Sequence, residues 1–203
     1  MNIFKELMDK SWATPGVGRV ENIDRSAGAS AKTGLTFLLA VLTSMFSLFV
    51  VGYRLRMGLA DWQPLADPNI LWLNTALLVF ASITMQLAKN AAGRGEIRGV
   101  QLHLTLAGIF TIAFLVGQYS AWQALVASGM YTPANPAFAF FVLLTALHAL
   151  HLIGGLYVWA KSAKNAWAGM EVTRFKVRVE LCTTYWHYLL FVWVVFFAIL
   201  LTT

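Results

Sequence analysis

Four histidines are the residues of this chain best suited to chemistry in an apolar setting: His103, His148, His151 and His187. His148 and His151 lie in the stretch ALHALHLIGG and share one face of a helix, because they are three residues apart. Two histidines on facing helices can ligate a haem axially, which His148 and His151 cannot do together. The pair to consider as haem ligands is therefore His151 and His187, with interhelical or lipid-headgroup hydrogen bonds and a proton relay as the alternatives.

Five apolar segments must position these histidines, since each is long enough to cross about 30 Å of hydrocarbon as a helix. At about 1.5 Å per residue, His151 and His187 fall at the same depth, roughly 12–14 Å from one membrane surface. The sequence predicts an all-α bundle of five transmembrane helices, residues 33–203, after an N-terminal segment, residues 1–32. The predicted spans are Thr33–Tyr53, Asn69–Ala88, Leu102–Val126, Ala137–Ala160 and Val179–Thr202.

The composition is that of a membrane protein. Of 203 residues 59% are hydrophobic and 12% charged, whereas about a quarter are charged in soluble domains. A net charge of +6 is then a topology signal and not a sign of nucleic-acid binding. The single cysteine, Cys182, excludes an intrachain disulfide and a cysteine-based metal cluster.

The first sixteen residues lack the apolar core of a cleaved signal peptide, so none is expected. Ile3, Phe4 and Leu7 predict a short amphipathic helix in the 1–32 segment, on the membrane surface or on a partner, with a frayed terminus as the alternative.

Basic residues predict the orientation. All of the 15 Lys and Arg residues except Arg54 and Arg56 precede the first span or lie between the second and third or the fourth and fifth. This asymmetry places the N-terminus in the cytoplasm and the C-terminus outside.

No carboxylate is expected near the middle of the membrane, which disfavours a transporter or a proton pump. Glu180 comes nearest, at the cytoplasmic start of the fifth span, where it could pair with Arg174 or Arg178 or remain solvated.

A stripe of small and polar residues on the fourth span predicts a contact face. His148, His151 and Gly155 are spaced by three and four residues, and Gly154 also follows His151 by three. Small residues let a neighbouring helix approach closely in a membrane. The predicted helix-contact or lipid-contact residues are Gln118, His148, His151, Gly154, Gly155, Trp186 and His187, with no catalytic or metal-ligating residue.

The last two spans resemble subunit III of the haem-copper respiratory oxidases. The fourth carries FFVLLTALHALHLIGG, similar to that family's phenylalanine-rich lead into HGLH and a glycine. The fifth carries ELCTTYWHYLLFVW, similar to its Glu and WHF-V-D-V-V-W pattern. Matching residues are His148, Leu150, His151, Gly154, Glu180, Trp186, His187 and Trp193, with weaker matches at Leu73–Thr75 and Gln118. Five spans agree with the short bacterial form of the family.

Several positions depart from the family pattern. Ala149 stands where glycine is usual and Leu190 where aspartate is usual, and Leu42 and Ala121 occupy positions that often hold glutamate. The intramembrane carboxylates of the family are therefore largely missing, which puts any role in proton handling in doubt.

The resemblance implies a non-catalytic accessory subunit of a cytochrome c or quinol oxidase in the bacterial inner membrane, without redox centres of its own. It implies direct packing on subunit I, subunit II in the same complex, haems and copper in those partners, and bound phospholipid. Alternatives are a subunit-III-like accessory protein of a nitric oxide reductase and a haem-binding membrane anchor with His151 and His187 as ligands.

Overall fold

The computed structural model describes residues 18–62, 69–127, 136–168 and 172–202, and side chains from residue 28 onward except those of 172–175. Within these ranges the regular structure is α-helical throughout. The helices are α2 (Gly18–Met57), α3 (Ile70–Arg94), α4 (Ile97–Ala127), α5 (Pro136–Trp167) and α6 (Val172–Leu200). The amphipathic helix predicted within residues 1–16 lies outside the described residues.

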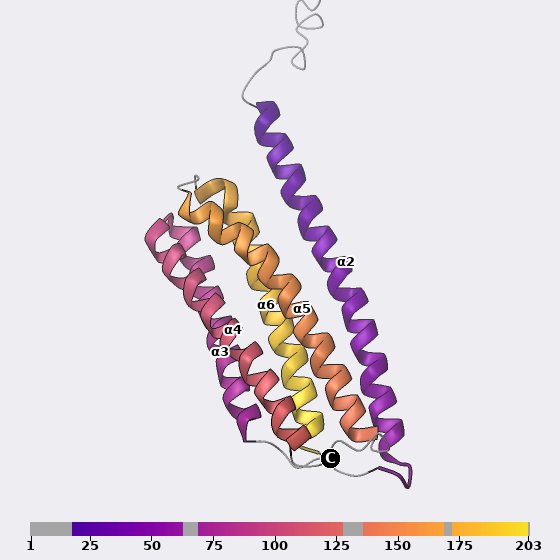
Figure 1. Cartoon of the computed structure of the whole chain (residues 1–203). Helices are drawn as coiled ribbons and strands as arrows, with labels where there is room; N and C mark the ends of the chain where they lie inside the picture. The colour runs from indigo at the N-terminus through magenta and orange to yellow at the C-terminus, as the bar shows by residue number, and fades with distance from the viewer. Residues whose placement is uncertain (1–17, 63–68, 128–135, 169–171, 203) are drawn as a thin grey trace, which may run out of the picture. The chain divides into compact units, whose positions relative to one another are not determined.

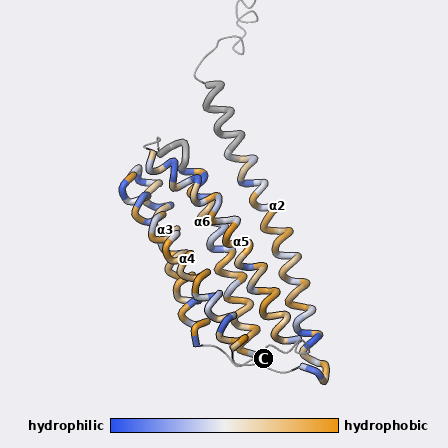
Figure 2. Tube along the Cα trace, in the orientation of Figure 1, coloured by the Kyte–Doolittle hydropathy of each residue, from blue (hydrophilic) through white to orange (hydrophobic). Residues whose placement is uncertain are grey.

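Each of these helices is long and apolar enough to cross a membrane, with candidate spans Gly28–Met57, Ile70–Arg94, Ile97–Ala127, Pro136–Trp167 and Lys176–Leu200. Hydrophobic residues dominate the middle of α3 to α6, and hydrophilic ones gather toward their ends (Figure 2). The predicted fold class, all-α with five membrane-spanning helices, is confirmed.

The helices begin and end at different residues from the predicted spans. α2 begins at Gly18 and not at Thr33, and α3 continues past Ala88 to Arg94. Hydropathy marks the part of a helix that suits lipid, whereas the helix itself ends at a cap. Gly95 supplies that cap for α3, with φ 76° and its N–H directed to the carbonyls of Ala91 and Ala92.

The chain divides into two compact units, Met1–Phe37 and Leu38–Thr203. The described part of the first, residues 18–37, is one helical stretch. In the second, α3 packs on α4 and α6, and α5 packs on the same two helices. These four helices run alternately in opposite directions (Figure 1), so the α3–α4 and α5–α6 connections meet at one end. We call it the basic end, because it carries Lys89, Arg94, Arg98, Lys161, Lys164, Lys176 and Arg178.

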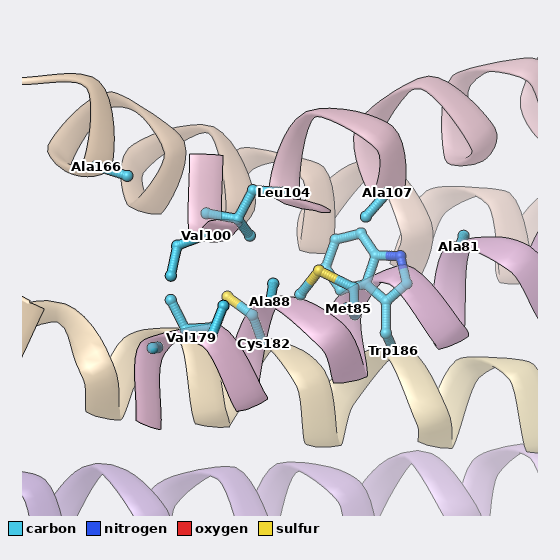
Figure 3. Close-up of a cluster of buried hydrophobic side chains, with 12 residues drawn as sticks. Ala81, Met85, Ala88, Val100, Leu104, Ala107, Ala166, Val179, Cys182 and Trp186 are labelled. Atoms are coloured by element: carbon cyan, nitrogen blue, oxygen red, sulfur yellow. The ribbon is translucent and has the colours of Figure 1, made fainter. Parts of the chain in front are cut away.

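Small residues allow α3, α4 and α6 to pack closely near the basic end. Ala81 and Ala88 of α3 and Ala107 of α4 are fully buried, and they belong to one cluster with the large Trp186 indole, which lies beside Met85 (Figure 3). Close approach of this kind supplies the van der Waals contact that holds membrane helices together.

The second half of α2 packs on α5 and α6 through a separate cluster. Leu42, Phe46 and Tyr53 of α2 are buried against Leu144 of α5 and Phe196 of α6. A hydrogen bond between Thr43 and Tyr188, 3.1 Å between the two oxygens, joins α2 to α6.

Candidate functional site

His148 lies at the centre of the α4–α5–α6 contact. Its side chain is 0% exposed, and its ring lies 5.3 Å from that of Trp193, 5.9 Å from Phe114 and 6.4 Å from Phe196. Neither ring nitrogen has a hydrogen-bond partner among the described residues. The structure therefore places His148 in a helix contact made of aromatic rings.

His151 points toward α2. Its Nδ1 lies 2.6 Å from the carbonyl oxygen of Leu147, and its ring meets that of Phe46 edge to face at 5.3 Å. Tyr185 of α6 donates its hydroxyl to the carbonyl of His151 at 3.2 Å. One face of α5 thus contacts both α2 and α6.

His187 points toward α3. Its Nδ1 bonds Ser82, and its Nε2 lies 3.1 Å from Oε1 of Gln86. The two rings turn toward different helices, since His187 bonds Gln86 of α3 and His151 contacts Phe46 of α2. The structure does not bring together the two residues that the haem hypothesis requires, and no group of three or more metal-ligating side chains occurs among the described residues. His103 is half-buried near the start of α4.

The two adjacent glycines of α5 have different surroundings. A Cβ added to Gly155 would lie 2.9 Å from Tyr185 Cε1 and 3.2 Å from Trp186 Cζ3, both on α6. A Cβ added to Gly154 would meet nothing within 4 Å. Gly155 is thus at a helix contact, whereas Gly154 faces away from the neighbouring helices.

Gln118 forms a buried amide pair with Asn74. Asn74 Nδ2 donates to Gln118 Oε1 at 3.2 Å, and both side chains are almost fully buried between α3 and α4. Gly117 makes room for this pair, because a Cβ there would lie 2.2 Å from Oδ1 of Asn74. Sequence reasoning expected Gln118 to bond across helices but did not identify Asn74 or Gly117.

Four tryptophan N–H groups also join the helices. Trp122 and Trp186 donate to the hydroxyls of Thr145 and Thr111, at 2.9 and 3.1 Å. Trp193 donates to the hydroxyl of Thr75 at 3.0 Å, and Trp159 to the carbonyl of Leu104 at 3.0 Å. Sequence reasoning missed these bonds, and the available signal was the occurrence of tryptophan and threonine within the spans.

Glu180 lies at the basic end in a pocket shared by α3 and α6. The pocket is lined by Lys89, Asn90, Gly93, Arg94, Lys176 and Glu180. The side chain of Arg174 lies outside the described residues and Arg178 is exposed, so the pairing of Glu180 with either arginine stays a prediction. The described residues thus form a helix-packing site with a polar rim.

Known proteins that are similar to this chain over most of its length are respiratory oxidase subunits. No protein-family model matches the chain. A probable cytochrome c oxidase subunit 3 of Mycobacterium leprae is 24% identical over 189 residues, 90% of this chain and 91% of that protein. Cytochrome c oxidase subunit 3 of Corynebacterium diphtheriae is 28% identical over 197 residues, 92% of each chain. Cytochrome bo(3) ubiquinol oxidase subunit 3 of Pseudomonas aeruginosa is 23% identical over 183 residues, 87% of each chain.

These similarities agree with the resemblance found in the sequence and extend it over about nine-tenths of the chain. They do not favour the nitric oxide reductase or haem-anchor alternatives. Together with the five apolar helices, they identify a multi-pass membrane protein similar to subunit III of the haem-copper oxidases.

Proposed function

We infer that this chain is subunit III of a haem-copper terminal oxidase, an accessory subunit of a complex that reduces oxygen and moves protons. The observation that carries the inference is similarity to oxidase subunits 3 along almost the full length of both chains. The P. aeruginosa relative is named as a ubiquinol oxidase subunit and the C. diphtheriae relative as a cytochrome c oxidase subunit.

The residues of the matching motifs support a structural role. Trp186 and Trp193 are buried and bond threonines of other helices, while His148 packs among aromatic rings. Such contacts fix how the helices of this chain are arranged. A fixed arrangement of helices gives a catalytic partner a stable surface to pack on.

The proposal includes direct packing on subunit I, subunit II in the same complex, and phospholipid bound at the helix surfaces. It places the chain in the bacterial inner membrane, with the basic end of the bundle in the cytoplasm according to the positive-inside rule. Haems and copper then belong to the partner subunits and not to this chain.

Purification of the tagged chain in a mild detergent tests the proposal. The expected result is co-purification of a large histidine-rich membrane subunit and a copper-binding subunit, with oxygen consumption by the complex. Co-purification with nitric oxide reductase subunits in place of these would reject it.

A further inference from the structure

A ladder of polar side chains follows the seam between α3 and α6. We define this polar seam as Gln86 and Asn90 of α3 with Thr184 and His187 of α6. His187 bonds Gln86, whose Nε2 donates to Oδ1 of Asn90 at 3.2 Å. Because the Gln86 amide nitrogen is the donor to Asn90, its Oε1 accepts from Nε2–H of His187, and Ser82 donates its hydroxyl to Nδ1.

The α6 side of the polar seam is exposed at a depth where water is absent. His187 lies eleven residues after Lys176, the first residue of its span, which is roughly 16 Å from that end and near the middle of about 30 Å of hydrocarbon. His187 and Thr184 are exposed at this depth, and Asn90 is exposed nearer the basic end, where it lines the pocket beside Lys89. Polar groups in contact with lipid chains at this depth are costly, so they usually face protein.

Other outward faces of the bundle differ in character. Ile109, Ile112 and Val116 of α4 and Ile153 of α5 are each more than half exposed and suit lipid chains directly. On α6, the exposed residues Phe191 and Val194 continue the same helix face beyond Thr184 and His187. This face therefore offers both polar and apolar contacts.

We propose that the polar seam is the docking face for a transmembrane helix of another subunit. The ladder uses one N–H of the Gln86 amide and neither N–H of Asn90. The partner helix accordingly presents oxygen acceptors at the level of Gln86 and Asn90. At the basic end it presents a carboxylate, because the pocket there is lined by Lys89, Arg94 and Lys176 beside the carboxylate of Glu180. This inference rests on the proposed membership of an oxidase complex.

Site-specific photocrosslinking in native membranes tests the proposal. A photoreactive amino acid replaces Thr184 on the seam, and in control chains it replaces Ile109 or Ile153. The expected result is a covalent adduct between position 184 and one membrane helix of a co-purifying oxidase subunit, absent from both controls. Lipid adducts alone at position 184, or equal protein adducts at all three positions, would overturn it.

A matched pair of substitutions provides a second readout. Thr184 and Thr105 are both exposed and both bond the carbonyl four residues earlier on their own helix. Thr184→Leu should lower the amount of retained partner subunit severalfold while leaving thermal unfolding of the isolated chain unchanged, and Thr105→Leu should retain the partner fully. Equal retention in both variants would contradict the docking face.

The two proposals fail separately in these experiments. If oxidase subunits co-purify but position 184 crosslinks only lipid, the docking face is wrong and the proposed function stands. If a different membrane protein crosslinks and no oxidase subunit co-purifies, the proposed function is wrong.

Discussion

At the scale of single residues, Gly155 and Gly154 show how one methyl group distinguishes two neighbouring positions. A Cβ on Gly155 would approach the Tyr185 and Trp186 rings more closely than packing allows, whereas one on Gly154 would meet no atom. Gly155→Ala should destabilise the chain by about 1–3 kcal/mol, the usual cost of overpacking, and Gly154→Ala should not. Unfolding in mixed detergent micelles measures both, and equal effects would contradict the Gly155 contact.

The buried amide pair predicts measurable coupling between α3 and α4. A double-mutant cycle of Asn74→Ala and Gln118→Ala should give an interaction energy of about 0.6–1.7 kcal/mol, the range for interhelical hydrogen bonds in membranes. Asn74→Ala combined with Gln86→Ala should be additive, because those two side chains share no contact that the structure describes. Additivity in the first cycle would show that the pair contributes nothing.

Residue spacing predicts part of this site. The spacing of His148, His151 and Gly155 predicts a contact face, and the structure places all three at contacts with other helices. Equal depth also suggested that His151 and His187 meet, which the structure does not show. Depth fixes the height of a side chain but not the direction in which it points, and direction depends on how each helix is rotated against its neighbours.

At the scale of elements, α2 has one face that packs and one that does not. Phe46 is 4% exposed and contacts His151 and Phe196, whereas Leu48 is 73% exposed. Phe46→Ala should cost about 2 kcal/mol, less than the roughly 3–5 kcal/mol of soluble cores, because lipid chains are as apolar as side chains and the hydrophobic part of the cost is missing in a membrane. Leu48→Ala should cost almost nothing. Unfolding in mixed detergent micelles measures both variants, and equal free energies of unfolding for Phe46→Ala and Leu48→Ala would contradict this packing.

The turn between α3 and α4 predicts a pH dependence. Arg94 Nε donates to Glu96 Oε1 at 2.7 Å, and this bond lowers the pKa of the Glu96 carboxyl below its ordinary value. A lowered folded-state pKa means that the stabilisation is complete above the unfolded-state pKa and is lost as the pH falls through the folded-state value.

Carbon-13 NMR titration of Glu96 should therefore give a pKa below that of an unpaired glutamate. The Arg94→Gln variant, which lacks the cation, should return that pKa to its ordinary value. A Glu96 pKa that is equal in both proteins would show that the ion pair does not form in solution.

Hydropathy located all five membrane helices but not their ends. The end of α3 depends on the left-handed conformation of Gly95, and six residues after Ala88 remain helical although they include Lys89 and Arg94. Polar residues can continue a helix beyond the hydrocarbon because they are in contact with water there. Spans predicted from hydropathy are therefore shorter than the helices.

At the scale of the whole molecule, the sequence predicts that the chain belongs to an oxidase complex, but it does not predict which side chains pair between the helices. Similarity over about nine-tenths of the chain and the His148 and His187 motifs both point to an oxidase subunit. The four tryptophan N–H bonds each join residues on different helices, separated by between 23 and 118 positions. No local pattern specifies such pairs.

The central claim is that this chain is an accessory subunit whose partners hold the redox centres. The most direct measurement is the visible absorption spectrum of the purified complex and of this chain after separation from it, with every co-purified subunit identified. We expect a haem spectrum in the complex, oxidase subunits I and II beside this chain, and no Soret band in the separated chain. A stoichiometric haem retained by the separated chain and lost in His187→Ala would contradict it.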